Sequence, residues 1–90
     1  MRFVIKNEIR GRMRIHLKQK RMTYEQADLL QYYMENVQGV CNVKIYERTC
    51  DAVVAYTGDR HKLLQSLKAF HYDAVTVPTG YLEQIGRAHV

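Results

Sequence analysis

Residues 10–21 of the chain read RGRMRIHLKQKR, and six of these twelve residues are Arg or Lys. Met13, Ile15 and Leu17 alternate with polar residues along the stretch, and a period of two is typical of a β-strand with one buried face. The extended pattern starts near the N-terminus, and Gly11 interrupts it, as glycine often does where a strand bends or bulges. We therefore expect a strand with an apolar face toward a core and a basic face outward.

Two amphipathic helices are expected in the rest of the chain. Residues 24–37 carry apolar side chains at helical spacing, and Thr23 with Gln26 forms a possible capping box at their start. Gly39 stands where a left-handed residue often terminates a helix. Asp59 is placed to cap a second helix. The buried side of that helix would hold Leu63, Leu64, Leu67 and Phe70.

Three further strands are expected from the same kind of pattern. Residues 40–47 (VCNVKIYE) and 52–57 (AVVAYT) are joined by a short turn, so they form an antiparallel hairpin, because a parallel crossover needs about a dozen residues. A last strand, residues 74–77 (AVTV), ends at Pro78. The order strand–helix–strand–strand–helix–strand predicts an α+β, ferredoxin-like βαββαβ fold: a four-stranded antiparallel sheet with two helices on one face.

Length and composition indicate one globular domain. The chain has 90 residues, of which 47% are hydrophobic and 26% charged. We place the domain in residues 1–78 and expect residues 79–90 to be a tail or linker, because they lack a full amphipathic period. No apolar run approaches the ~20 residues that span a bilayer, and the N-terminus does not resemble a secretory signal. We expect a cytoplasmic setting.

Two parts of the sequence resemble the heavy-metal-associated domain family. Residues 37–56 (VQGVCNVKIYERTCDAVVAY) and residues 66–75 (SLKAFHYDAV) match its second half, with His71 where the family typically has glycine. Residues 9–17 (IRGRMRIHL) resemble the PGRIRLR-like opening of a divergent branch at the N-termini of heavy-metal-transporting P-type ATPases. The resemblance implies the ferredoxin-like fold and an association with metal ion transport.

The resemblance does not extend to the family's metal site. Metal-carrying members place Met-x-Cys-x-x-Cys in the loop after the first strand, and the two thiolates hold a soft ion. Here that loop, residues 18–23 (KQKRMT), has no cysteine, and its basic side chains would repel a cation. The other Cys and His residues lack the spacing of zinc modules. We assign no metal ligand and no cofactor.

Cysteines and acidic residues give no catalytic site. Cys41 shares its predicted strand face with Val43 and Ile45, so we expect it to be buried, whereas Cys50 at the hairpin turn should be accessible. The three aspartates that could serve in catalysis are interpreted as turn or cap residues that bond backbone amides. These are Asp51, Asp59 and Asp73. With no nucleophile motif or phosphate-binding loop, we expect no enzyme activity from this domain.

The net charge of +5 favours an anionic partner, and two readings stay open. The first is a regulatory or docking domain of a metal-transporting ATPase, or a small stand-alone relative, that contacts an acidic protein surface or an anionic membrane surface. The second is a stand-alone module that binds RNA or another polyanion, although the outward face of the first strand has no aromatic residue for base stacking. The docking reading uses the basic edge formed by Arg12, Arg14, Lys18, Lys20 and Arg21. The polyanion reading uses the basic strand, with Arg12, Arg14 and Lys18.

Overall fold

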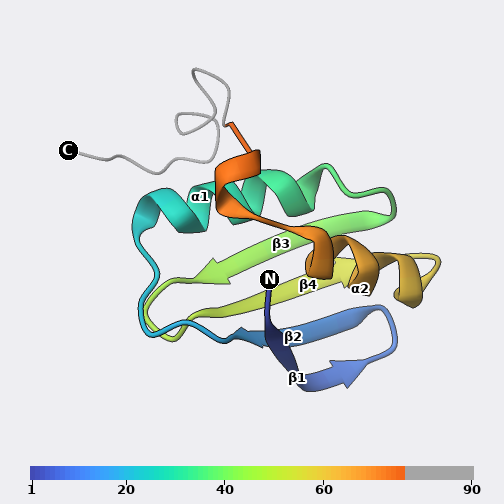
Figure 1. Cartoon of the computed structure of the whole chain (residues 1–90). Helices are drawn as coiled ribbons and strands as arrows, with labels where there is room; N and C mark the ends of the chain where they lie inside the picture. Colours follow the sequence, from blue (N-terminus) through green and yellow to red (C-terminus); the bar gives the residue numbers. More distant parts are fainter. Residues whose placement is uncertain (77–90) are drawn as a thin grey trace.

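The computed structural model describes residues 1–76, which form one four-stranded antiparallel sheet and two helices. The elements are β1 (Phe3–Ile9), β2 (Arg12–Leu17), α1 (Tyr24–Glu35), β3 (Val40–Tyr46), β4 (Asp51–Tyr56), α2 (Arg60–Ala69) and a 3-10 turn η1 (Tyr72–Ala74) (Figure 1). The strands lie in the order β1-β2-β4-β3. The predicted α+β, ferredoxin-like fold class is confirmed, with both helices packed against one face of the sheet.

The order of the elements differs from the predicted βαββαβ at the two ends of the described chain. The stretch expected as one interrupted strand is a hairpin, because Gly11 adopts φ +80° and reverses the chain between β1 and β2. β1 thus takes the sheet edge beside β2, where the predicted last strand would have paired. The two-residue turn between β1 and β2 brings these strands together at a small cost in loop-closure entropy.

The prediction of a last strand at residues 74–77 is wrong for residues 74–76, the part that the structure describes. Tyr72, Asp73 and Ala74 form η1 instead. The Tyr72 hydroxyl donates a hydrogen bond to Gln19 Oε1 at 2.7 Å, and its ring packs edge-on against Phe70. These contacts hold the segment near the start of α1 rather than at the sheet edge. Residue 77 and the predicted tail, residues 79–90, lie outside the described residues.

Both helix starts form as predicted. Thr23 and Gln26 make a complete capping box, and the Asp59 side chain accepts a hydrogen bond from the backbone N–H of His61. α1 ends at Glu35, two residues before the predicted end, and Asn36 caps it. Gly39 instead makes the entry to β3, with φ +91° and its carbonyl bonded to the N–H of Thr57.

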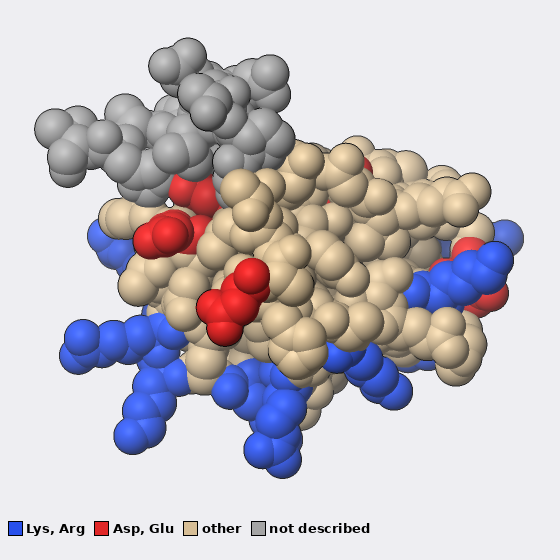
Figure 2. Space-filling view, turned by 45° about the horizontal axis from the view of Figure 1, so that its top comes forward, with Lys and Arg blue, Asp and Glu red and all other residues tan. Residues whose placement is uncertain are grey.

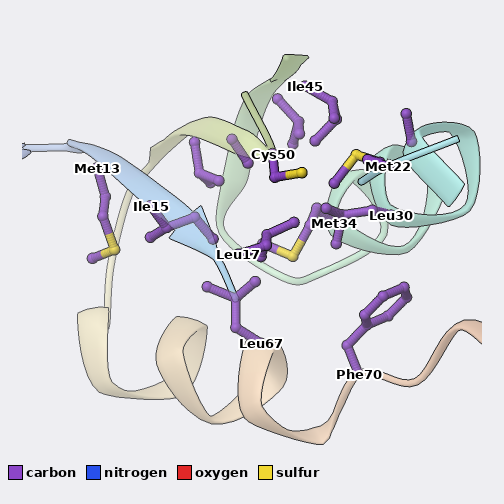
Figure 3. Close-up of a cluster of buried hydrophobic side chains, with 14 of the residues drawn as sticks. Met13, Ile15, Leu17, Met22, Leu30, Met34, Ile45, Cys50, Leu67 and Phe70 are labelled. Carbon is purple, nitrogen blue, oxygen red and sulfur yellow. The ribbon is translucent and has the colours of Figure 1, made fainter. Parts of the chain in front are cut away.

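The core lies between the helices and the inner face of the sheet (Figure 3). Met13, Ile15 and Leu17 of β2 are fully buried there, as their alternation predicted. The remaining buried apolar residues are Met22, Ala27, Leu30, Met34, Val43, Ile45, Cys50, Ala52, Val54, Leu63, Leu67 and Phe70. Over residues 1–76, neither helix has the length and apolar character needed to cross a membrane.

Candidate anion-binding surface

Within residues 1–76, the outer face of the sheet carries no helix and presents mostly polar side chains. We call it the open face, and the pairing registers and burial assign its members. They are Val4, Lys6, Asn7 and Ile9 of β1; Arg12, Arg14 and His16 of β2; Asp51, Val53 and Ala55 of β4; and Asn42, Lys44 and Tyr46 of β3. A bulge between Ile5 and Asn7 adds Lys6 to this face beside Asn7.

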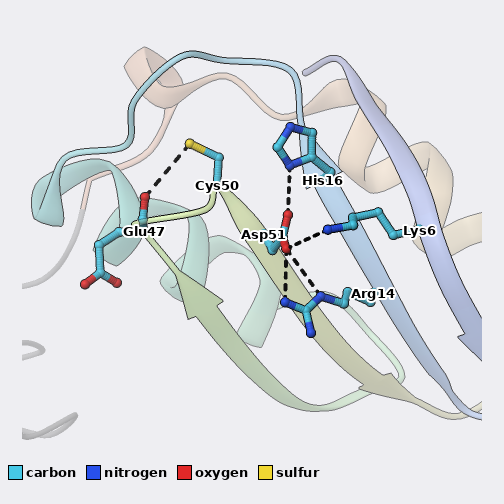
Figure 4. Close-up of polar contacts among 6 residues, drawn as sticks. All are labelled: Lys6, Arg14, His16, Glu47, Cys50 and Asp51. Atoms are coloured by element: carbon cyan, nitrogen blue, oxygen red, sulfur yellow. Dashed lines mark hydrogen bonds and ion pairs between the residues drawn. The ribbon is translucent and has the colours of Figure 1, made fainter.

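Asp51 is the centre of the polar contacts on the open face (Figure 4). The strand register sets it opposite His16, and its side chain is only 1% exposed. Its Oδ1 lies 2.8 Å from His16 Nδ1, while its Oδ2 accepts hydrogen bonds from Arg14 Nη2 at 3.0 Å and Lys6 Nζ at 3.2 Å. Three strands therefore converge on one carboxylate.

The pKa of Asp51 reflects two opposed effects. Burial by itself raises the pKa of a carboxyl group, because a low-dielectric setting disfavours the charge. The hydrogen bonds with His16, Arg14 and Lys6 outweigh this effect and lower the Asp51 pKa from 3.8 to about 2. Asp51 is therefore ionised at neutral pH and neutralises part of the positive charge around it.

Arg14 has a second partner on the same face. Its guanidinium carbon lies 5.3 Å from the centre of the Tyr46 ring, and Lys44 Nζ lies at the same distance from that ring. Such cation–π contacts contribute about 0.5–1 kcal/mol each at exposed sites. Arg14 is thus fixed by Asp51 and Tyr46 together, and its charge is already matched within the domain.

The five basic residues predicted from the sequence do not form one cluster. Arg12 and Arg14 lie on the open face and border a small hollow of about 170 Å³. Lys18 instead lines a hollow at the edge formed by β1 and α2, and Lys20 and Arg21 are exposed in the loop between β2 and α1. Within residues 1–76, Arg14 is the one of the five with an ion pair.

The loop that joins β2 to α1 is held by Gln19. Its amide nitrogen lies 3.3 Å from Gln26 Oε1, and its amide oxygen accepts the hydrogen bond from Tyr72. Met22 is buried beneath the loop, so Lys20 and Arg21 project from a fixed backbone segment. No group of three His, Cys, Asp or Glu residues that could hold a metal ion occurs within the described part of the chain.

Sequence reasoning missed Asp51, which it assigned to a turn. Asp51 is in fact the first residue of β4, and it faces away from Ala52 and Val54. The period of two through β4 could have placed it on the polar face. Its partners could not be found in this way, because they depend on the pairing of β4 with β2 and of β2 with β1.

The expectations for the two cysteines are both wrong. Cys41 is exposed, because a bulge between Val40 and Asn42 breaks the alternation that links it to Val43. Cys50 is buried in the core, although it lies in the hairpin turn with φ +57°. Burial raises the pKa of the Cys50 thiol, and the nearby Asp51 charge adds to the effect.

Aromatic side chains are absent from the outer face of the two central strands, β2 and β4. Val54 and Tyr56 of β4 both face the helices. The Tyr56 hydroxyl donates to Glu8 Oε2 at 3.1 Å. The stacking platform that single-stranded RNA uses on folds of this kind is therefore not formed on these two strands.

Comparisons with known proteins add nothing to this geometry. A scan of protein-family models, a search of curated proteins and a search of solved structures each gave no match to the chain.

Proposed function

We propose that the chain is a docking domain that binds an acidic protein surface through its basic side chains. One observation carries the proposal: among the described residues, Arg12, Lys18, Lys20 and Arg21 make no ion pair. Unmatched Arg and Lys side chains are available for carboxylates, and arginine can bind them with two parallel hydrogen bonds. Figure 2 shows Lys and Arg side chains that project from the rim of one face of the molecule.

We further propose that the acidic surface belongs to a heavy-metal-transporting P-type ATPase, with this chain as its N-terminal cytoplasmic domain or a small stand-alone relative. The support for this step is the sequence resemblance of residues 9–17, 37–56 and 66–75. The loop that carries metal-binding cysteines in other members carries Lys18, Lys20 and Arg21 here. Its proposed role is therefore contact or regulation at the cytosolic face of the membrane rather than metal delivery.

The docking proposal is tested by titration with poly-L-glutamate, which stands in for an acidic protein surface, and with single-stranded RNA. We expect saturable binding to poly-L-glutamate that weakens as salt increases. Replacing Lys20 and Arg21 by alanine should weaken binding about tenfold, on the basis of about 0.7 kcal/mol per charge. A control variant, Arg10→Ala with Lys62→Ala, loses the same charge at the opposite end of the sheet and should change binding less than about twofold.

Two results would overturn the docking proposal. Equal losses in the two variants would show a general charge effect rather than a surface. Tighter binding of RNA than of poly-L-glutamate, lost on Arg12→Ala, would favour the polyanion module instead. The transport proposal has a separate test in the complete coding sequence: membrane spans followed by an Asp-Lys-Thr-Gly-Thr phosphorylation motif are expected, and a gene that encodes neither contradicts membership of a pump.

A further inference from the structure

The edge strand β1 has an unusual distribution of exposed apolar side chains. Of the four large hydrophobic residues exposed in the described chain, three lie on β1: Val4 at 41%, Ile5 at 38% and Ile9 at 60% exposure. Apolar residues on both faces are typical of a strand whose two faces are both covered. Within residues 1–76, β1 pairs with β2 alone.

The register leaves backbone groups of β1 free at the open edge. The N–H of Lys18 donates to the carbonyl of Arg2, and hydrogen-bonded pairs alternate with non-bonded ones in an antiparallel ladder. Phe3 and Ile5 therefore direct their N–H and C=O groups away from β2. The bulge at Lys6 ends this regular edge, so it offers room for a short added strand along residues 2–5.

A hollow of about 510 Å³ lies beside this part of the edge, between β1 and α2. Its apolar lining comes from Met1, Phe3, Val4, Ile5 and Leu64. Arg2, Lys18 and Lys68 surround it with three positive charges. The hollow can therefore take aliphatic side chains, and its rim can take carboxylates.

We propose that β1 binds an extended acidic peptide segment, which adds a fifth strand to the sheet along residues 2–5. The partner's aliphatic side chains lie over the hollow, and its carboxylates contact Arg2, Lys18 and Lys68. A second copy of this chain fits less well, because edge-to-edge pairing would bring two sets of these cations together. This inference rests on the proposed docking function, and it names the partner as a β-strand rather than a folded acidic surface.

The test uses an end-capped peptide of alternating Glu and Val residues, titrated into the 15N-labelled full chain. We expect the amide signals of Phe3 and Ile5 to shift and to become protected from hydrogen exchange. The same peptide with alternate backbone nitrogens methylated has the same charge but cannot complete the strand ladder. Its affinity should fall about tenfold or more, while equal affinity of both peptides would overturn strand addition.

Two matched variants locate the contact. Ile5→Glu places a negative charge at the proposed site and should weaken binding about tenfold, whereas Ile9→Glu adds the same charge beyond the bulge and should have less than about a twofold effect. The dispersion of the amide spectrum reports whether each variant is folded. If a variant is unfolded, the comparison of the two peptides on the wild-type chain still tests the proposal.

Failure of this inference can be told apart from failure of the docking proposal. Shifts confined to Arg12, Lys20 and Arg21 would overturn the strand site and leave docking supported. Binding of poly-L-glutamate without binding of the alternating peptide would likewise overturn the strand site and support docking. Shifts at Phe3 and Ile5 that persist in the Lys20→Ala, Arg21→Ala variant support the strand site even if those two residues prove dispensable. If the chain binds neither poly-L-glutamate nor the alternating peptide, both proposals are overturned.

Discussion

At the residue scale, the carboxylate of Asp51 joins strands that are distant in sequence. Lys6 and Arg14 keep 48% and 42% of their side-chain surface exposed, so they remain partly solvated while Asp51 is almost wholly covered. Asp51, as the buried member of this group, depends most on the contacts. A buried ion without them would lose its hydration and gain no compensating interaction. Asp51 therefore matters more for stability than any single exposed cation around it.

Replacing Asp51 by asparagine should lower the free energy of unfolding by about 2 kcal/mol, because the three partners lose a charged acceptor in a buried position. Urea unfolding followed by circular dichroism measures this change. Asp73→Asn removes the same charge from an exposed position in η1 and should cost less than about 0.5 kcal/mol. Similar values for the two variants would contradict the proposed role of Asp51.

Acid should remove the contribution of Asp51 in a defined pH range. Its pKa is about 2 in the folded chain and 3.8 in the reference state, so its ionised form stabilises the fold above about pH 4. The stabilisation, about 2 kcal/mol, is lost as the pH falls from about 4 toward 2. Unfolding experiments across this range should show a steeper loss for the wild-type chain than for Asp51→Asn. Parallel curves would show that other carboxylates account for acid unfolding.

The two thiols should differ sharply in reactivity. Cys41 is exposed, whereas Cys50 is 3% exposed and has a raised pKa, so less thiolate is present to react. A disulfide reagent added to the folded chain should label Cys41 at once, and Cys50 only after denaturant is added. In Cys41→Ser, labelling should slow by about 100-fold or more. Fast labelling of that variant would show that the hairpin turn opens readily.

At the scale of elements, β1 is attached to the rest of the fold on both sides of its bulge. Beyond the bulge, Glu8 accepts hydrogen bonds from Arg60 of α2 at 2.6 and 2.9 Å. The hydrogen bond from Arg60 is the main reason that the pKa of Glu8 lies below its usual value. Before the bulge, Phe3 pairs with Leu17. The strand is held in place, and no other strand within residues 1–76 pairs with its outer edge near Ile5.

The entry to β3 depends on glycine at position 39. A Cβ atom there would lie 2.6 Å from the carbonyl oxygen of Thr57, and the backbone has φ +91°. Gly58 has a similar φ of +85° but open space around it. Gly58→Ala should therefore cost about 1 kcal/mol for the backbone alone, and Gly39→Ala about 2 kcal/mol or more. Thermal unfolding of the two variants measures these losses of stability. Equal losses would show that a Cβ atom at position 39 does not clash with the Thr57 carbonyl.

At the scale of the whole molecule, residues 1–76 hold a four-stranded sheet and the core between that sheet and the two helices. A chain shortened to end at Thr76 should keep cooperative unfolding, with a stability change under about 1 kcal/mol. A chain that begins at Gly11 loses β1 and exposes the edge of β2, so it should unfold at a lower temperature and aggregate. Circular dichroism and light scattering separate the two cases. Loss of folding in the first chain would contradict the assignment of β1 as the fourth strand.

Much of the architecture follows from local physical chemistry, which the sequence contains. Alternation assigned Met13, Ile15 and Leu17 to the core, and the caps at Thr23 and Asp59 fixed the starts of both helices. A short turn was enough to require the β3–β4 hairpin. Each of these features depends on residues within a few positions of one another, so the sequence alone determined the fold class and most of the core.

The tertiary structure decided the features that depend on pairing between distant segments. Asp51 meets Lys6 and Arg14 only because β4, β2 and β1 are neighbours in the sheet. A single extra residue at the bulge moved Cys41 to the surface, since one residue of slip reverses the faces of a strand. The place of β1 at the sheet edge depends on closure of the turn at Gly11, and the place of η1 depends on the Tyr72 contacts. Neither is visible in a local pattern.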